Sequence, residues 1–230
     1  MRHEARPLAG RGLTEVQERR LAALLDMLES DEHAPTSVRD ATLAASKHLA
    51  DSLSALELPA VRGAEQIADL GSGPGFPGLA LAVALPGAHV SLVESQRRKC
   101  EFLARMCIAA GVENADVICT RAEGWEEGRS RNDVVVARAL APQTVVLEYA
   151  APLLRLGGSL VDWRGRRARP EEDAAARAAA ELGLRRVEIR RVQPFAGARD
   201  HHLHLFTKVG ETPARFPRRA GMARKRPLGG

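Results

Sequence analysis

The stretch from Gln66 to Gly78, Gln-Ile-Ala-Asp-Leu-Gly-Ser-Gly-Pro-Gly-Phe-Pro-Gly, constrains the fold of this chain more than any other. The pattern predicts a short apolar strand that runs into a turn packed with glycine. Gly71, Gly73 and Gly75 remove side chains at alternate positions, so a bulky ligand can approach bare backbone. Where a first parallel strand meets a helix N-terminus, exposed amides and the helix dipole form a nucleotide-type pocket. A flexible turn is the alternative that the motif alone leaves open.

An acid at the end of the next predicted strand supports the nucleotide-type pocket. The apolar run Val90–Val93 ends at Glu94, 23 residues after Gly71. A carboxylate about 20 residues beyond such a turn is placed to accept hydrogen bonds from ribose hydroxyls. A ligand that contains a nucleoside is therefore predicted. The alternative is that Glu94 caps the helix that follows.

From residue 66 onward the chain alternates strand and helix patterns, which predicts an α/β fold with a doubly wound, mostly parallel sheet. Further strands are expected at 90–94, 116–119, 133–137, 159–163, 185–192 and 202–209, which makes seven in all. Helices are expected at 95–110, 142–154 and 170–182, with a turn at 157–158. The last two strands are predicted to form a hairpin at one sheet edge.

Two helices are predicted to precede the sheet, in an N-terminal extension over residues 1–63. Thr14 and Gln17 have the spacing of a capping box at the start of the first helix. The second helix is expected over Val38–Leu56, after a loop. The leucines that would form the buried face of the first helix are Leu21, Leu24, Leu25 and Leu28.

Positive charge is concentrated near the C-terminus. Residues 185–230 contain 12 Arg and Lys against 3 Asp and Glu, whereas the whole chain has a net charge of +5. Such segregation is typical of proteins that bind a polyanion, because Lys and Arg displace counterions from phosphates. Residues 211–230 are predicted to be a basic arm, too rich in proline and arginine for regular structure. A solvated tail without a nucleic-acid partner is the alternative.

Several classes of protein and site are disfavoured. The three cysteines lack the paired spacing of a zinc site, so neither a disulfide framework nor a structural metal is indicated. His201, His202 and His204 are poor candidates for metal ligands, because strand alternation leaves them without a Cys or acid that completes a site. The sequence shows neither a signal peptide nor an apolar run of about 18 residues. A cytoplasmic protein without a membrane partner is therefore expected.

The acid before the first glycine narrows the choice of ligand. A dinucleotide site favours Gly-x-Gly-x-x-Gly, in which the second glycine admits a pyrophosphate. Asp69 would repel a pyrophosphate but suits an ammonium group and a cationic sulfur, which describes S-adenosylmethionine. Phe76 is expected either to cover part of this ligand or to be a core aromatic. Arg138, at the end of a buried strand, is either a site residue or a salt-bridge partner.

Six motifs follow one another in an order typical of one family. They are His48-Leu-Ala-Asp-Ser-Leu53, Asp69-Leu-Gly-Ser-Gly-Pro-Gly-Phe-Pro-Gly78, Leu92-Val-Glu-Ser95 with Lys99 and Phe102-Leu103, Arg121-Ala-Glu123, Arg138-Ala139, and Phe216-Pro-Arg-Arg219. From about Leu13 to its end the chain thus resembles the RsmG (GidB) family of bacterial 16S ribosomal RNA guanine-N7 methyltransferases. The chain departs from the family pattern at Ala50, often Leu; at Arg164, often Lys; and at Phe216, often Tyr.

The resemblance implies a Rossmann-like class I methyltransferase domain over residues 64–210, with the last strand antiparallel. The cofactor would be S-adenosylmethionine, and the partner would be 16S ribosomal RNA or the 30S subunit. Deleting the arm is expected to weaken RNA binding and to leave cofactor binding unchanged. The implied cofactor-binding residues are Asp69, Gly71, Ser72, Gly73, Gly75, Phe76, Glu94, Ala122, Glu123 and Arg138. The implied RNA-binding residues are His48, Arg164, Arg218, Arg219, Lys225 and Arg226.

Methylation of guanine N7 needs no general base, so no catalytic side chain is predicted. The N7 atom is an unprotonated acceptor, and its lone pair can attack a sulfonium methyl directly. Catalysis then depends on orientation, which can lower a barrier by roughly 7 to 11 kcal/mol. Two alternatives are a methyltransferase that acts on a small molecule or protein, and a non-catalytic nucleotide- or RNA-binding module. A monomer is expected.

Overall fold

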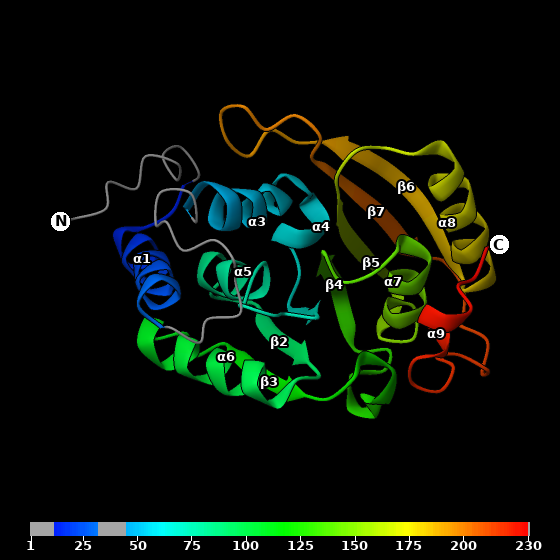
Figure 1. Cartoon of the computed structure of the whole chain (residues 1–230), viewed down its shortest axis with the longest axis horizontal. Helices are drawn as coiled ribbons and strands as arrows, with labels where there is room; N and C mark the ends of the chain where they lie inside the picture. The colour runs from blue at the N-terminus through cyan, green and yellow to red at the C-terminus, as the bar shows by residue number, and fades with distance from the viewer. Residues whose placement is uncertain (1–11, 32–44, 230) are drawn as a thin grey trace.

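A seven-stranded sheet crosses the middle of the molecule in the computed structural model, which describes residues 12–31 and 45–229 (Figure 1). The strand order is β3-β2-β1-β4-β5-β7-β6, and β7 runs antiparallel to both of its neighbours. The predicted doubly wound, mostly parallel sheet is thereby confirmed. The strands are β1 (Gln66–Leu70), β2 (His89–Glu94), β3 (Ala115–Cys119), β4 (Asn132–Arg138), β5 (Leu154–Arg164), β6 (Leu184–Arg191) and β7 (His202–Lys208).

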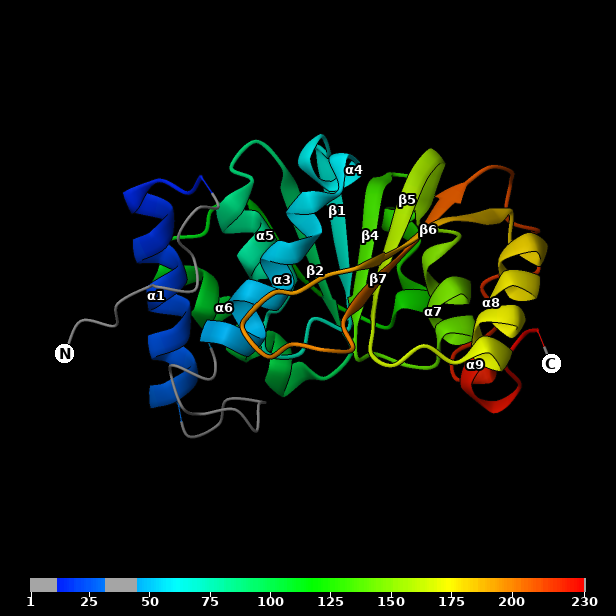
Figure 2. The ribbon, with the colours of Figure 1, turned by 90° about the horizontal axis from the view of Figure 1, so that it is seen from above.

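Helices cover both faces of the sheet, and α1 lies at the opposite end of the molecule from α8 and α9 (Figure 2). On one side α1 packs on α5 and α6, and on the other α7 packs on α8 and α9. The α-helices are α1 (Glu15–Ser30), α3 (Asp51–Leu53), α4 (Pro59–Arg62), α5 (Gly78–Ala84), α6 (Arg97–Ala110), α7 (Gln143–Ala150), α8 (Arg169–Glu181) and α9 (Met222–Lys225). The other helical turns are η2 (Ala45–Ala50), η3 (Ser54–Glu57), η4 (Ala122–Gly124) and η5 (Glu126–Gly128).

Two hydrophobic cores lie on the two faces of the sheet, because successive strand residues point in opposite directions. In β1, Ile67 joins the core under α1, α5 and α6, whereas Ala68 joins the core under α7 and α8. Val134 and Val135 of β4 divide in the same way. The run of valines therefore fills both layers, as expected of a strand buried on both sides.

The capping box predicted for the first helix is present at the start of α1. Thr14 Oγ1 accepts a hydrogen bond from the Gln17 N–H at 3.3 Å, and Gln17 Oε1 accepts one from the Thr14 N–H at 2.8 Å. The Gln17 amide also donates to the carbonyls of Val83 at 3.0 Å and Ala84 at 3.2 Å. All four predicted leucines are buried. The capping box therefore also attaches α1 to the end of α5.

The second predicted helix differs in form from the expectation of one regular helix over Val38–Leu56. Residues 38–44 lie outside the described residues. The described part passes from the π-helix η2 through α3 to the 3₁₀-helix η3. Ser52 Oγ donates to the carbonyl of His48, and Ser54 Oγ donates to that of Asp51 at 2.5 Å. Such serine bonds to the backbone compete with regular helical bonding.

Three predictions about the second half of the chain were wrong. The helix expected to reach residue 154 ends at Ala150, because β5 begins at Leu154. The expected glycine turn at 157–158 lies inside β5, where a Cβ on Gly158 would be 2.9 Å from the carbonyl oxygen of Asn132. The basic arm includes the short helix α9 and buries Phe216.

Within the described ranges, no helix is long and apolar enough to cross a membrane.

Candidate cofactor-binding site

A cavity of about 230 Å³ lies beside the carboxyl ends of β1, β2 and β4. The order of strands reverses at β1, and ligands of open α/β sheets bind at such a position. The cavity is lined by Gly71, Val93, Glu94, Ser95, Gln96, Lys99, Thr120, Arg121, Ala122, Glu123, Ala139, Leu140, Tyr149 and Arg224.

The glycine turn after β1 has the backbone that its sequence predicts. Gly71, Gly73 and Gly75 have φ angles of +69°, +54° and +101°, in the left-handed region that favours glycine. A Cβ on Gly71 would lie 2.5 Å from Cδ1 of Leu140, which lines the cavity. The missing side chain therefore lets the wall of the cavity close against bare backbone.

Glu94 lies on the cavity wall, with 5% of its surface exposed. Its Oε2 accepts a hydrogen bond from the Gly73 N–H at 3.1 Å, and its Oε1 accepts one from the Gln96 N–H at 2.9 Å. The carboxylate is thus held between the glycine turn and the start of α6. A carboxylate offers about four acceptor positions, so Glu94 can still accept hydrogen bonds from ribose hydroxyls. Both functions considered for this acid, a ribose acceptor and a partner of the helix start, are compatible.

Asp69 points into the protein and does not line the cavity. Its side chain is 1% exposed, and its Oδ2 accepts a hydrogen bond from the Gly78 N–H at 3.0 Å. Burial raises the pKa of this carboxyl from 3.8 to about 6, although hydrogen bonds from Gly78 and Ser72 oppose the increase. The predicted contact between Asp69 and a ligand's ammonium group stays a prediction, since its carboxyl faces Gly78 in this structure. Asp69 instead holds the first residue of α5.

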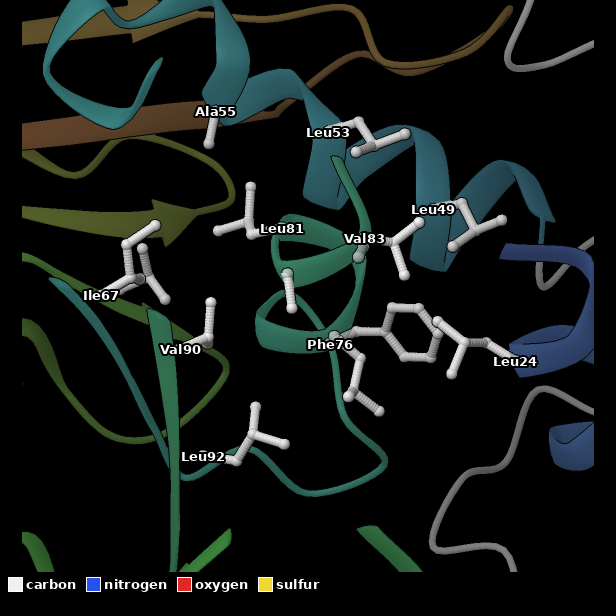
Figure 3. Packing of buried hydrophobic residues seen from close by; sticks show 14 of the residues in the cluster. Leu24, Leu49, Leu53, Ala55, Ile67, Phe76, Leu81, Val83, Val90 and Leu92 are labelled. Atoms are coloured by element: carbon white, nitrogen blue, oxygen red, sulfur yellow. The ribbon is translucent and has the colours of Figure 1, made fainter. Parts of the chain in front are cut away.

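Phe76 and Arg138 are also not among the residues that line the cavity. The ring of Phe76 is 3% exposed and packs in the core beside Leu24 (Figure 3). Of the two possibilities raised for this residue, the structure shows the core aromatic. Arg138 Nη1 lies 3.0 Å from Oδ2 of the buried Asp51, so it is a salt-bridge partner that joins β4 to α3.

Four of the ten predicted cofactor-binding residues line the cavity: Gly71, Glu94, Ala122 and Glu123. Ser72, Gly73 and Gly75 shape the turn without lining the cavity. Tyr149 and Arg224 line it but were not predicted. Tyr149 is the only tyrosine of the chain, yet it lies in a helix with no motif around it. Arg224 could not be found from sequence, because its position depends on how the C-terminal residues fold back.

The predicted RNA-binding residues occupy different environments. Arg218 forms an ion pair with the fully buried Glu148, with 2.9 Å between Arg218 Nε and Glu148 Oε1. Its guanidinium therefore holds the C-terminal residues in place. Arg164 Nη1 donates to the carbonyl of Ala141 at 2.9 Å and lines a second cavity. The ring of His48 lies beside that of Phe76, with 5.3 Å between centroids and a tilt of 31° between the ring planes. Exposed side chains are those of Arg219, Lys225 and Arg226.

A buried polar group near the end of β5 involves one of the three histidines considered above. His204 Nδ1 lies 3.0 Å from Gln143 Nε2, which also donates to Oδ2 of Asp162 at 2.9 Å. Burial lowers the pKa of His204 to about 4, and its Nε2 has no hydrogen-bond partner. In the part of the chain that the structure describes, no three His, Cys, Asp or Glu side chains are grouped so that they could hold a metal ion.

The donor and acceptor groups of the cavity fit S-adenosylmethionine. Glu94 supplies acceptors for a ribose, and Gly71 exposes backbone at the switch point of the sheet. The family described as rRNA small subunit methyltransferase G (GidB) matches residues 17–202. A relative from Syntrophomonas wolfei, named Ribosomal RNA small subunit methyltransferase G, is 39% identical over 202 residues, covering 87% of this chain and 94% of that protein. The chain belongs to the rRNA small subunit methyltransferase G family.

Other comparisons agree with this membership of the methyltransferase G family. A Chloroflexus aggregans protein of the same name is 36% identical, and the match covers 94% of this chain and 92% of that protein. Among solved structures, a mutant of MtNAS in complex with S-adenosylmethionine is 20% identical with a TM-score of 0.57, covering 84% of this chain and 73% of that one. Aeropyrum pernix fibrillarin, with natively bound S-adenosyl-L-methionine, is 20% identical with a TM-score of 0.55. The match covers 69% of this chain and 73% of that one. These two likenesses concern the fold. The predicted S-adenosylmethionine-dependent methyltransferase is confirmed.

Proposed function

We propose that this protein transfers the methyl group of S-adenosylmethionine to N7 of one guanine in a loop of 16S ribosomal RNA. The observation that carries this proposal is the cavity at the switch point, with Glu94 on its wall, in a member of the methyltransferase G family. The relatives are named for methylation of small-subunit ribosomal RNA. The N7 position follows from the family resemblance of the sequence motifs.

The residues of the chain hold and orient the reactants. When bound, S-adenosylmethionine would supply a methyl group on a cationic sulfur. The lone pair of guanine N7 would form a bond to the methyl carbon while the carbon–sulfur bond breaks, and the sulfur would leave as a neutral thioether. Because N7 carries no proton at neutral pH, no side chain has to act as a general base. Glu94 would hold the ribose, while Ala122 and Glu123 would flank the adenine. Positioning of this kind can account for roughly 7 to 11 kcal/mol of barrier lowering.

A second cavity beside the first offers a place for the target nucleotide. Its volume is about 720 Å³, and it shares Ala139 and Leu140 with the cofactor cavity. Most of its lining residues are apolar, and Arg164 and Glu171 are its charged ones. A guanine turned out of its RNA loop would reach the methyl group through this cavity, because enzymes that modify bases remove them from the stack. Arg164 would then contact the nucleotide or its phosphate.

The RNA would bind across several parts of the chain. Arg219, Lys225 and Arg226 are exposed on the C-terminal residues and would contact phosphates. The extension over 1–63 would contribute His48, and the domain over 64–210 would contribute Arg164. Arg218, which is paired with Glu148, would act on RNA through the position of the segment 211–230. The protein would act as a monomer in the cytoplasm, where the 30S subunits are.

A methyl-transfer assay with two RNA substrates tests the proposal. Tritiated S-adenosylmethionine is supplied with 16S RNA or 30S particles from a strain that lacks the enzyme, and primer extension maps N7-methylguanine. We expect label at one guanine on at least one of these substrates. Label on a small molecule or protein instead of RNA would contradict the proposal. Binding of S-adenosylmethionine without any transfer would favour a non-catalytic module.

A further inference from the structure

The C-terminal segment, residues 213–229, folds back against α7 near the cofactor cavity. Figure 1 shows α9, which belongs to this segment, beside α7 and below α8. Phe216 and Ala223 are buried, and both belong to the hydrophobic core that contains α7 and α8. The segment is thus part of the folded domain.

A buried ion pair anchors the C-terminal segment. Glu148 of α7 is fully buried, and its Oε1 accepts hydrogen bonds from the Arg218 N–H at 3.2 Å and from Nε at 2.9 Å. Arg218 Nη2 donates to Glu148 Oε2 at 2.5 Å and to the carbonyl of Arg226 at 2.8 Å. One guanidinium therefore joins α7 to two points of the segment. Removal of Arg218 would leave the buried charge of Glu148 without its counterion.

The segment reaches the cavity through Gly221 and Arg224. The Gly221 N–H donates to Glu123 Oε1 at 3.1 Å, and Arg224 Nη2 donates to the carbonyl of Leu140 at 2.8 Å. Glu123, Leu140, Tyr149 and Arg224 all line the cavity. The segment thus links the loop after β3 to the loop after β4.

We propose that the C-terminal segment forms part of the cofactor site, with Arg224 in contact with the nucleoside end of S-adenosylmethionine. The inference rests on the proposed function, in which Glu94 at the end of β2 would accept hydrogen bonds from the ribose. Glu123 follows the next strand outward, β3. A base attached to that ribose would therefore lie toward Glu123 and Arg224. Arg218 is a positioning residue that acts through Glu148. This proposal therefore predicts weaker cofactor binding when the arm is deleted, in place of the unchanged binding expected from the sequence.

Isothermal titration without RNA tests the contact at Arg224, which is exposed and can be replaced without opening the core. We expect Arg224→Ala to raise the Kd for S-adenosylmethionine roughly tenfold, the scale of one lost hydrogen bond to a charged group. The Kd for 5′-methylthioadenosine, which lacks the amino-acid part, should rise by the same factor. Arg215→Ala removes an exposed charge of the same segment outside the cavity and should leave both affinities unchanged. Wild-type affinities in Arg224→Ala would overturn the proposal.

A second pair of variants tests the positioning role of Arg218. The double variant Glu148→Gln, Arg218→Gln avoids an unpaired buried charge, and Arg218→Lys retains the charge. In the double variant we expect faster hydrogen exchange in residues 213–229, unchanged exchange in β1 and β4, and a raised Kd for S-adenosylmethionine. The single variant Arg218→Lys should bind S-adenosylmethionine more tightly than the double variant but less tightly than the wild type. Faster exchange of the segment together with a wild-type Kd would show that the cofactor does not depend on it.

Discussion

Gly78, the first residue of α5, has no room for a side chain. A Cβ there would lie 2.6 Å from Oδ2 and 2.9 Å from Cβ of Asp69. We expect Gly78→Ala to lower the free energy of unfolding by about 1–3 kcal/mol, the usual cost of overpacking. Gly87→Ala is the matched control, because nothing lies within 4 Å of a Cβ at that position. Urea unfolding followed by circular dichroism measures both, and equal midpoints for the two variants would contradict this explanation.

Asp162 should make the stability of the protein depend on pH. Burial raises the pKa of its carboxyl from 3.8 to about 7, against the opposing effects of Arg164 and a hydrogen bond from Gln143. Between these pH values the folded protein keeps a proton that the unfolded chain has released, so the free energy of unfolding falls as pH rises. As pH rises from 4.5 to 8, the free energy of unfolding should fall less in Asp162→Asn than in the wild type, by on the order of 3 kcal/mol.

Urea unfolding at pH 4.5 and pH 8 compares this variant with the wild type. The buried His204 has the opposite effect, since its lowered pKa costs stability as pH falls, but it is present in both proteins. Glu113→Gln, at an exposed acid, is the control and should keep the wild-type pH dependence. The explanation fails if Asp162→Asn shows the same loss as the wild type.

At the scale of elements, the start of α1 combines a local cap with a tertiary contact. Thr14→Ala removes the cap and should cost about 1 kcal/mol of unfolding free energy. Gln17→Ala should cost more, because it also leaves the carbonyls of Val83 and Ala84 without their donor. Thr14→Ser keeps a capping hydroxyl and serves as the control. In thermal unfolding, Thr14→Ser should be the most stable variant, Thr14→Ala the next and Gln17→Ala the least stable. A Gln17→Ala variant as stable as Thr14→Ser would argue against docking of α1 through the Gln17 side chain.

At the scale of the whole molecule, exposed positive charge near α9 should control the salt dependence of RNA binding. Replacing Arg219 and Lys225 by Gln removes two cations that are proposed to contact phosphates. The slope of log K against log salt should become less steep by roughly 1.4, since each contact with single-stranded RNA contributes about 0.7. The control replaces Arg19 and Arg98, exposed residues of α1 and α6. Helix α1 lies at the opposite end of the molecule from α9 (Figure 2). Equal slopes in the two double variants would remove the C-terminal residues from the RNA interface.

Local patterns in the sequence were enough to determine the sheet, its strands and the glycine turn. Three short-range properties can be read along the chain: the alternation of apolar residues, the capping box at Thr14, and the interval from Gly71 to Glu94. The boundaries of β5 were missed, because a strand that passes through Gly157 and Gly158 depends on its contacts with β4.

Only the tertiary structure decided which way the charged residues face. Arg138 pairs with Asp51, which is 87 positions earlier, and Arg218 pairs with Glu148, which is 70 positions earlier. No periodicity relates residues so far apart, and a buried charge selects whichever partner the folded chain brings to it. The position of the cofactor cavity at the strand ends, in contrast, was determined by the sequence itself. The return of the basic C-terminal segment to its wall depended on packing across the whole domain.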